Sequence, residues 1–593
     1  MPVGDIVNQE TRRQKYEALR TQMTLERSSF ISHWRELNDF ILPRRARFFT
    51  TDVNKGDRRN QKIIDSTGTL ALRTMRSGMM AGITSPAREW KKLTTDDPDL
   101  ADYGPVKNWL SVVNERMSNM FLRSNLYNAL PITYGDLGVF GTSVMFMEED
   151  FDAVMRCQVL PIGSYMIAND DTMRVRVLFR EFPLTVRQIV MKFGFDRMTG
   201  KPNWNNISDY VHTQWDRGNY EQWVDVCHVI QPNMEYDDKR LLSKYKKFLS
   251  CYYEKGSTRG SDTMYMNKDD QAKYLRESGY DYYPALGVRW EVTGEDVYAT
   301  DCPGMTALGD IKQLQHGEKK SAQAVDKKIS PAMVAPTSLK HQKATILPGD
   351  ITFLDVREGQ QGFKPAHEVD FSIKEHEEKQ QQVRLRIQRA FYEDLFLMLA
   401  QSDRREITAR EIEERHEEKL LALGPVLEQL NQDLLDPLID NAFDFMMRQG
   451  LIPPPPPELQ QEGPNQLKVE YISIMAQAQK LVGISSIERF AEFVDARVVA
   501  SKDTSFYDKI DRDQMIDKYG DRLGIDPEII VPDEKVAQIR ADRAKQQQQT
   551  IQAENAANMA GAAKNLSETD LSKDSALSRL LAQAQAGQIT EGA

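Results

Sequence analysis

The sequence predicts an α+β fold that is mostly helical. Two local patterns support this prediction. Stretches near both ends of the chain repeat apolar residues with a helical period, whereas residues 143–290 hold short alternating apolar runs punctuated by glycine, proline and asparagine. The chain has 593 residues, which is enough for several packed units and a sizeable core.

The N-terminal part of the chain is expected to begin with helices. Helical periodicity covers residues 10–42 and ends before Pro43. A second helix is expected over residues 65–80, with Asp65 or Ser66 as its N-cap, and a third over residues 106–121.

Short strands are expected next, with helices between them. The clearest apolar runs are Val144–Met147, Val175–Phe179 and Phe248–Tyr253, which favour antiparallel strands. Just before the first run, glycines recur every third residue at positions 135, 138 and 141. That spacing differs from a dinucleotide-binding fingerprint and favours close helix packing ahead of a strand.

The most informative segment is residues 303–331, which predicts one amphipathic helix between two prolines. About 25 residues of helix would be roughly 37 Å long. Its polar arc holds Lys312, His316, Lys319, Lys320, Gln323 and Lys327. Its apolar arc, broken only by Glu318, holds Ile311, Leu314, Ala322, Val325 and Ile329. A lysine-rich face is commonly just a solvated face, but this geometry also suits a wall that faces a polyanion.

Residues 331–372 are broken by prolines and glycines and predict a compact α+β module. A strong helix is expected over residues 372–400, where apolar residues recur every fourth position from Val383 to Leu399. A polar loop with Arg404 and Arg405 follows at 401–407. Two helices joined by a small module would form a stalk that cannot bury its long apolar faces within one chain. Side-by-side packing of identical subunits in a closed ring would bury them.

The C-terminal part is expected to be mainly helical. Thr408 and Glu411 are typical of a capping box that opens a helix to about residue 450, with kinks at Gly424–Pro425 and Pro437. Five prolines at 453–457 favour a stiff linker over a ligand for a proline-binding module. The tail after residue 546 is rich in Gln, Ala, Asn and Ser, which predicts a loose helix or disorder.

Composition limits the function classes. The net charge is −11 and the pI is about 5.5, so contact with nucleic acid would depend on local basic patches. Residues 308–343 form such a patch, because they include seven lysines and only three acidic residues. Four widely spaced cysteines indicate reduced thiols rather than disulfides or zinc. The N-terminus lacks an apolar signal core and no apolar run reaches membrane-spanning length, so a soluble protein is expected, without membrane contact.

The sequence shows no catalytic constellation. It lacks the GxxxxGK[ST], HExxH and GxSxG patterns, and its acidic clusters are too diffuse to indicate a nuclease metal site. We therefore predict no enzymatic activity, no cofactor and no metal site.

Several motifs follow one another in the order found in one family. They include Trp34-Arg35-Glu36-Leu37, Gly82-Ile83-Thr84-Ser85-Pro86 with Trp90, Asp136-Leu137-Gly138-Val139-Phe140-Gly141-Thr142, Arg289-Trp290-Glu291-Val292, Ala390-Phe391-Tyr392-Glu393-Asp394-Leu395-Phe396 and Leu423-Gly424-Pro425-Val426. Over roughly residues 15–540 the chain resembles the head-to-tail connector, or portal, proteins of short-tailed bacteriophages.

This resemblance implies a dodecameric ring at one capsid vertex of the virion, assembled in the host cytoplasm, through which DNA is packaged and ejected. It divides the chain into a wing (1–304), a first stem helix (305–330), a clip (331–372), a second stem helix (373–400), a tunnel loop (401–407), a long kinked helix (408–452), a crown (453–540) and a C-terminal tail (541–593). The implied partners are double-stranded DNA, read without sequence specificity, the terminase large subunit, tail adaptor or nozzle proteins, the major capsid protein and its scaffold.

Within this scheme the channel-lining candidates are Lys312, Lys319, Lys320, Lys327, Arg404 and Arg405. The candidates for docking of motor and adaptor at the clip are Lys340, His341, Lys343 and Phe353. The alternative is an oligomeric virion assembly scaffold that does not enclose DNA, and a nuclease is a more distant third hypothesis.

Overall fold

The computed structural model divides the chain into two compact units, Met1–Gln479 and Lys480–Ala593. All strands of the described part of the chain lie in the first unit. The structure describes residues 12–48, 56, 59–97, 100–101, 103–195, 200–255, 274–330, 333–334, 364–365, 373–401, 423–462, 467–472, 484–501, 511, 513–516, 519, 531 and 533–567.

Four helices of the first unit pack on the main apolar core. They are α1 (Arg12–Phe40), α2 (Thr67–Gly82), α4 (Gly104–Arg123) and α5 (Leu126–Phe140). The predicted helices over 10–42, 65–80 and 106–121 correspond to α1, α2 and α4. Ser66 is the N-cap residue of α2, but the side-chain bond comes from Asp65, whose Oδ1 accepts from the Thr67 amide at 2.7 Å.

Two antiparallel sheets form the middle of the first unit. A three-stranded sheet has the order β3 (Val154–Leu160), β2 (Thr142–Asp150), β9 (Ala285–Arg289). A five-stranded sheet follows chain order: β4 (Tyr165–Asn169), β5 (Val175–Thr185), β6 (Trp223–Pro232), β7 (Phe248–Glu254) and β8 (Arg276–Tyr280). Short helical elements lie in its connections: α6 (Val186–Ile189), the π-helical turn η1 (Val190–Gly194), α7 (Asp209–Asp216) and the 3-10 turn η2 (Ser243–Tyr245). The predicted strands are confirmed in β2, β5 and β7.

Close packing explains the glycines of α5. A Cβ at Gly138 would lie 2.9 Å from Met75 Cε and 3.1 Å from Leu72 Cδ1 of α2, so glycine lets the two helices approach closely without displacing these side chains. Gly141 ends α5 in the left-handed region, at φ 73°, and the chain turns directly into β2. The interpretation of this glycine spacing as helix packing ahead of a strand is confirmed.

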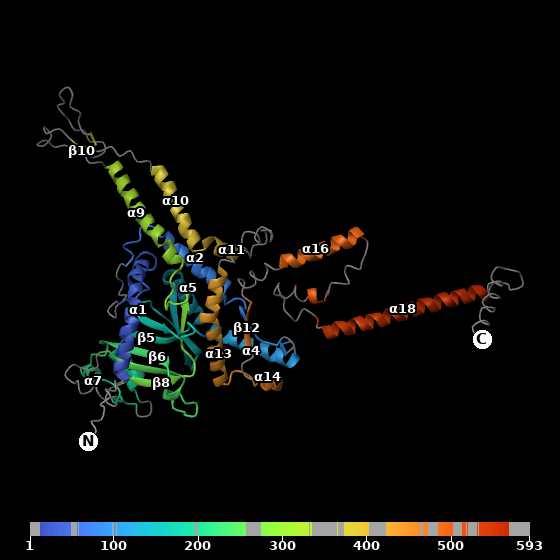
Figure 1. The fold of residues 1–593 in the computed structure, drawn as a ribbon, viewed down its shortest axis with the longest axis horizontal. Coiled ribbons are helices and arrows are strands. Elements are labelled where there is room, and N and C mark those ends of the chain that lie inside the picture. Colours follow the sequence, from blue (N-terminus) through green and yellow to red (C-terminus); the bar gives the residue numbers. More distant parts are fainter. Residues whose placement is uncertain are drawn as a thin grey trace, which may run out of the picture. The chain divides into compact units, whose positions relative to one another are not determined.

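Two helices leave the body side by side. Figure 1 shows α9 (Pro303–Ile329) and α10 (Ile373–Ala390) running together away from the sheets, and their backbones are in contact. Between them, β10 (Met333–Val334) pairs with β11 (Lys364–Pro365) in antiparallel fashion. The rest of the predicted module over 331–372 lies outside the described residues.

The second of these helices is shorter than predicted. The sequence predicts one helix over 372–400, but α10 ends at Ala390 and α11 (Glu393–Gln401) begins after a turn. Tyr392 has φ 54°, a left-handed conformation that is rare for a bulky residue. Tertiary packing favours this break, because Phe391, Leu395 and Phe396 are all buried in the core.

A proline shapes the helix that crosses residues 423–448. Residues 423–430 are α-helical, the π-helical turn η5 covers Asn431–Leu435, and α13 spans Asp436–Arg448. Pro437 is the second residue after the π turn, and the wider turn leaves room for its ring, which in a regular α-helix would clash with the preceding turn. The distortion predicted at Pro437 thus takes the form of a π turn. Residues 402–422, with the predicted capping box, lie outside the described residues.

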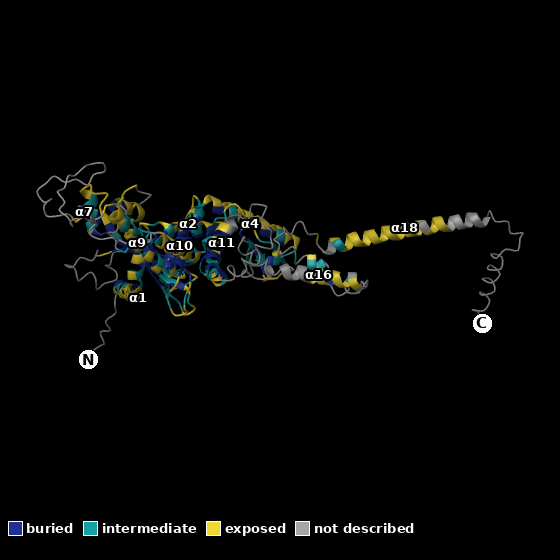
Figure 2. Ribbon diagram, turned by 90° about the horizontal axis from the view of Figure 1, so that it is seen from above, coloured by how far each residue is buried: buried dark blue, intermediate teal, exposed yellow. Residues whose placement is uncertain are grey.

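The first unit extends to Gln479 and includes the five-proline run. The five-proline run begins against α4, where Trp109 Nε1 donates to the Pro453 carbonyl at 2.9 Å, and it leads into α14 (Pro457–Glu462). β12 (Leu467–Tyr471) then pairs with β1 (Lys91–Thr95). In the second unit, α16 (Ile484–Ser501) precedes α18 (Asp533–Ser567), and Figure 2 shows most of the described side chains of α18 as exposed.

The four cysteines are buried free thiols, and burial raises the pKa of Cys157, Cys227 and Cys302 to about 12. None of the helices in the described ranges combines the length and the apolar character that a membrane span requires.

Prediction from glycine packing. Gly78→Ala is expected to lower the free energy of unfolding by about 2 kcal/mol or more, because the added Cβ would overlap the buried Phe396 ring. Gly309→Ala is the matched control, because open space surrounds Gly309 in α9, and it is expected to stabilise by about 1 kcal/mol. Urea unfolding of the purified protein measures both. Equal effects of the two substitutions would contradict the packing argument.

A row of paired residues crosses the five-stranded sheet. Arg180 lies opposite His228, His228 opposite Tyr252, and Tyr252 opposite Arg276. Arg180 Nε donates to His228 Nδ1 at 2.9 Å, and the ring stacks on Tyr252 with centroids 3.7 Å apart. Burial, followed by repulsion from Arg180, Lys192 and Arg276, holds the pKa of His228 well below its ordinary value.

Prediction from the buried histidine. The unfolded chain binds a proton at this histidine below about pH 6.5, whereas the folded chain does not. Stability should therefore fall as the pH drops below that value, by up to about 1.4 kcal/mol per pH unit. His228→Gln is expected to reduce this fall in the free energy of unfolding at acid pH. His212→Gln, which removes an exposed ion pair, serves as the control. Urea midpoints between pH 5 and 7 test this; an unchanged slope in His228→Gln would refute it.

Candidate nucleic-acid interface

The helix with the lysine arc is only half embedded. α9 has 27 residues, about 40 Å of helix, and starts with Pro303 in the first turn. Its buried residues end at Gln315. On the predicted apolar arc, Ile311 and Leu314 are buried, whereas Ala322 and Ile329 are exposed and Val325 is half-buried. In a single chain the distal half of this arc is therefore only partly covered.

Tight backbone contacts fix the base of α9. A Cβ at Gly304 would lie 2.8 Å from the Val139 carbonyl oxygen of α5. The buried Gln315 side chain accepts from the amides of Ile64 (2.6 Å) and Asp65 (2.8 Å), and donates to the Asp65 carbonyl (2.7 Å). These three bonds satisfy the amide and tie α9 to the segment that precedes α2.

Arg384 of α10 joins three separate segments. Its Nε donates to Asp65 at 2.9 Å, and one of its terminal nitrogens donates to Glu318 of α9 at 2.5 Å. Burial raises the pKa of Asp65, but hydrogen bonds from Thr67 and Arg384 outweigh this and hold it below its ordinary value. The carboxylate therefore stays ionised and keeps the α9–α10 pair attached to the body.

Two further contacts hold α10 against α9. The Arg386 guanidinium donates to both carboxylate oxygens of Asp310, with distances from 2.7 to 3.2 Å. Farther along, Gly317 leaves room for Gln380, whose Nε2 would lie 3.0 Å from an added Cβ. Sequence periodicity indicated an apolar seam here, but it gave no signal for the arginine partners.

The predicted lysines fall into two groups. Lys312 points to α1, where its Nζ lies 2.5 Å from Glu36 Oε2 and 5.8 Å from the Phe40 ring centroid. By contrast, Lys319, Lys320 and Lys327 are exposed, and they form no ion pair within the described ranges. They lie beyond the embedded half of α9, where a polyanion could reach them.

The other predicted site residues are not described. Arg404 and Arg405, and the predicted clip residues Lys340, His341, Lys343 and Phe353, lie outside the described residues. Their assignment stays a prediction.

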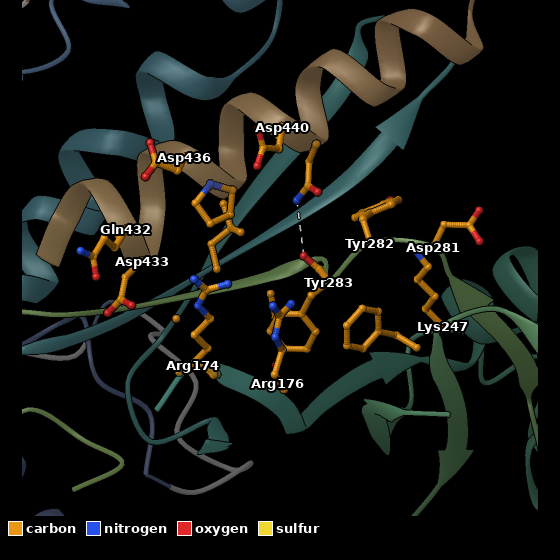
Figure 3. A pocket seen from close by; sticks show the side chains of 17 residues that line it. Arg174, Arg176, Lys247, Asp281, Tyr282, Tyr283, Gln432, Asp433, Asp436 and Asp440 are labelled. Carbon is orange, nitrogen blue, oxygen red and sulfur yellow. Dashed lines mark hydrogen bonds between the residues drawn. The ribbon is translucent and has the colours of Figure 1, made fainter. Parts of the chain in front are cut away.

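A separate cavity of about 520 Å³ lies between the start of β5, the β8–β9 turn and the η5–α13 helix. Figure 3 shows Asp433, Asp436 and Asp440 on that helix and Arg174 and Arg176 across from it. Most of these acids have structural partners. Asp433 pairs with the buried Arg289 at 3.2 Å, and Asp436 accepts from the Tyr471 hydroxyl.

Asp440 is the remaining acid of this row. Burial, with repulsion from Asp436 and Asp444, raises its pKa. Among the described residues, no three His, Cys, Asp or Glu side chains are grouped so that they could hold a metal ion. Asp433 and Asp436 therefore attach the η5–α13 helix to β9 and β12.

Comparison with known proteins identifies the family. Residues 13–531 match the model of a family described as bacteriophage head to tail connecting protein. The chain belongs to this connector family. It is 46% identical to the portal protein of Salmonella phage epsilon15 over 579 residues, which cover 98% of this chain and 100% of that protein. It is 42% identical to the probable portal protein of Bordetella phage BPP-1 over 556 residues, 94% of this chain and 95% of that one.

The resemblance to connector proteins predicted from the ordered motifs is thereby confirmed. Membership of the connector family does not favour the alternative of a scaffold that never encloses DNA. Within the family match lie α9, α10 and their anchoring residues Asp65, Gln315 and Arg384.

Prediction from the anchoring arginine. Arg384→Met is expected to lower the free energy of unfolding by about 2–3 kcal/mol, because Asp65 and Glu318 lose their shared partner while partly buried. It should also speed hydrogen exchange in α9. Arg389→Met, at an exposed position of the same helix, is the control and should change stability by less than about 0.5 kcal/mol. Similar results for the two variants would contradict the anchoring role.

Proposed function

We propose that this chain is a portal protein, whose copies close into a ring at one capsid vertex and enclose the DNA that enters and leaves the head. The observation that carries the proposal is the full-length similarity to portal proteins of two phages. The projecting α9–α10 pair, which the sequence predicted as a stalk, supports it independently.

The partly covered distal half of α9 supports the ring. Ala322, Val325 and Ile329 continue the apolar arc, but Ala322 is exposed, Ile329 is 75% exposed and Val325 is only half-buried in a single chain. Neighbouring copies packed side by side would cover this surface, and a head-to-tail contact that closes on itself gives a ring. The number of twelve copies is taken from the family resemblance.

The exposed lysines suit a channel that DNA must slide through in both directions. Lys319, Lys320 and Lys327 would repeat once per copy around the ring and attract phosphates weakly. The net charge of −11 per chain repels phosphate elsewhere, so contact is confined to the few positions where cations face the channel. Lysine holds a phosphate less firmly than the bidentate arginine fork does, which favours sliding. Because Lys312 already pairs with Glu36, we assign it a smaller share of this contact.

We extend the family scheme to the whole chain as a proposal. Residues 1–304 would form the wing, 305–330 and 373–400 the stem, 331–372 the clip, 401–407 the tunnel loop, 408–452 a long kinked helix and 453–540 the crown, followed by the tail. The clip, with Lys340, His341, Lys343 and Phe353, would dock the terminase large subunit and later the tail adaptor. Arg404 and Arg405 would face the DNA. The capsid protein and its scaffold would surround the ring in the virion, and no catalytic role is assigned.

A cryo-electron map of the purified assembly tests the function. It should show a closed ring whose axial channel is wide enough for a DNA duplex, with α9 lining part of it. Filaments, discrete dimers, or a ring without such a channel would refute the portal assignment and return support to the scaffold hypothesis.

Prediction from the exposed lysines. Replacing Lys319, Lys320 and Lys327 together by Gln is expected to lower DNA retention and packaging while leaving ring assembly intact, because only phosphate attraction is lost. The difference in packaged DNA between this variant and the wild type should shrink as the salt concentration rises from about 50 mM to about 200 mM. Screening weakens the same phosphate attraction in the wild type. Packaged DNA per head and ring images measure the two outcomes.

Two matched controls accompany this test. Replacing the exposed Lys15, Lys201 and Lys545 by Gln removes the same charge elsewhere and should leave packaging unchanged. Replacing the three α9 lysines by Arg keeps the charge and should slow DNA release. If the Gln rings package and hold DNA at wild-type levels at every salt concentration, this face of α9 does not contact DNA.

A further inference from the structure

Three cations meet beside one tyrosine of the five-stranded sheet. Arg180 lies on β5, Lys192 on the π-helical turn η1 and Arg276 at the start of β8. We call these three residues the cation cluster. Arg180 Nη2 donates to the Tyr252 hydroxyl at 3.2 Å, and Lys192 Nζ lies 5.3 Å from the centroid of the Tyr252 ring. Arg276 is the register partner of Tyr252, which places their Cβ atoms about 5 Å apart.

Two features of the fold bring the cation cluster together. Strands β5, β6, β7 and β8 are consecutive in the sheet, and their register aligns Arg180 with Arg276 across the two strands between them. Over this row lies η1, whose Phe193 ring is 5.3 Å from the Tyr252 ring, centroid to centroid. A π-helical turn is rare and is frequently found at functional sites. Here it holds Lys192 against the row of paired side chains.

The guanidinium of Arg180 is buried without an acid. The residue is 5% exposed, and it forms no ion pair in the part of the chain that the structure describes. Its Nε donates to Nδ1 of the neutral His228 ring at 2.9 Å, and its Nη2 donates to a phenol hydroxyl. The remaining nitrogen, Nη1, has no hydrogen-bond partner among the described residues. Because an unpaired charge is costly to bury, this guanidinium indicates an anionic partner.

The other two cations also lack partners. Lys192 and Arg276 are exposed residues, and neither takes part in an ion pair or a side-chain hydrogen bond within the described ranges. Glu148 of β2 is close enough to attract Lys192, but its Oε1 accepts from the Tyr280 hydroxyl at 3.2 Å. Three cations beside this carboxylate leave two positive charges without a counter-charge.

Repulsion inside the cation cluster shows that its members lie close together. Burial of its ammonium against the sheet lowers the pKa of Lys192, although attraction to Glu148 partly offsets this effect. Repulsion from Arg180 and Arg276 lowers the same pKa further. The fold therefore holds three like charges together at a cost that a bound anion would remove.

The chemistry of the cation cluster fits a phosphate group with two negative charges. A guanidinium fork matches the oxygens of a phosphate, and Arg180 retains Nη1 as a donor. Arg276 and Lys192 supply a second guanidinium and an ammonium at the solvent side. A phosphate monoester carries between about 1.5 and 2 negative charges at pH 7, which balances the two uncompensated positive charges. A carboxylate, or one phosphodiester of a DNA backbone, brings a single charge.

We infer that Arg180, Lys192 and Arg276 form a binding site for a doubly charged phosphate group, either free or as the monoester of a nucleotide. Arg180 binds this group at the floor of the site, and Lys192 and Arg276 bind it from the solvent side. The site belongs to β5, η1 and β8 rather than to α9. It goes beyond the proposed portal function and does not depend on it.

Equilibrium dialysis of the purified protein against radiolabelled inorganic phosphate tests the inference, at about pH 8 and with the ionic strength held constant by chloride. The wild type is expected to bind phosphate saturably. Lys192→Met with Arg276→Met should weaken binding about tenfold or more, because two charged contacts are lost. Arg217→Met with Lys239→Met is the matched control. It removes two exposed cations that form no ion pair with described residues, and it should bind phosphate as the wild type does.

Urea unfolding separates phosphate binding from a structural role of the cations. In chloride alone, the double variant of Lys192 and Arg276 should have the same urea midpoint as the wild type or a higher one, because repulsion is relieved. Added phosphate should raise the midpoints of the wild type and of the control more than that of the double variant. A ligand that binds only the folded state stabilises it.

Competition identifies the source of the phosphate group. Unlabelled inorganic phosphate and adenosine monophosphate are each expected to displace the label from the wild type. Tighter competition by the nucleotide would identify a nucleotide as the ligand, and tighter competition by inorganic phosphate would identify the free ion. A DNA duplex without terminal phosphates should compete only weakly, because each of its phosphates carries one negative charge.

Four results would overturn the inference. Wild-type binding that does not saturate would show that no site exists. Equal weakening in the control variant would make the effect one of overall charge. A lower urea midpoint of the double variant in chloride would show that its two cations are structural. Equal competition by the duplex, at the same concentration of phosphate groups, would contradict the preference for a doubly charged ligand.

Discussion

The arrangement of the first unit's long helices depends on the two ion pairs that the Arg384 guanidinium forms. The guanidinium lies between Asp65, which precedes α2, and Glu318, which belongs to α9, while Arg384 itself belongs to α10. α9 has no buried residue after Gln315, so apolar packing stops where this ion-pair group begins. The direction in which α9 projects, and hence the position of its exposed lysines, follows from these partly buried charges.

Arginine and lysine have different roles in this chain. Arg45 forms a bidentate pair with the buried Asp136, and Arg289 pairs with Asp433 in the core. Both are geometric ties between distant segments, and the planar guanidinium fork suits them. The cations left exposed on the distal half of α9 are lysines, whose compact ammonium binds phosphate without fixed geometry. This difference suits a helix pair that arginine ion pairs hold in place and whose exposed lysines make weak, exchangeable contacts with phosphate.

Much of the fold could be predicted because its signals are local. The period of the apolar residues predicted α1, α2 and α4, and the alternating runs predicted β2, β5 and β7. The break at Tyr392 could not be predicted. Its neighbours are ordinary helix-compatible residues, and the turn is imposed by burial of Phe391 and Phe396 against helices that come much earlier in the chain. Local helix propensity is overridden wherever long-range packing contributes more to the free energy of folding.

By itself the sequence determined that residues 303–331 form an amphipathic helix with a lysine arc, and that the ordered motifs are those of a connector protein. Only the tertiary structure decided which of those lysines are available. Lys312 meets Glu36, 276 positions away in the chain, whereas Lys319, Lys320 and Lys327 extend past the body. Helical periodicity depends on neighbours along the chain. An ion pair between residues far apart in the sequence depends on their distance in space, and folding sets that distance.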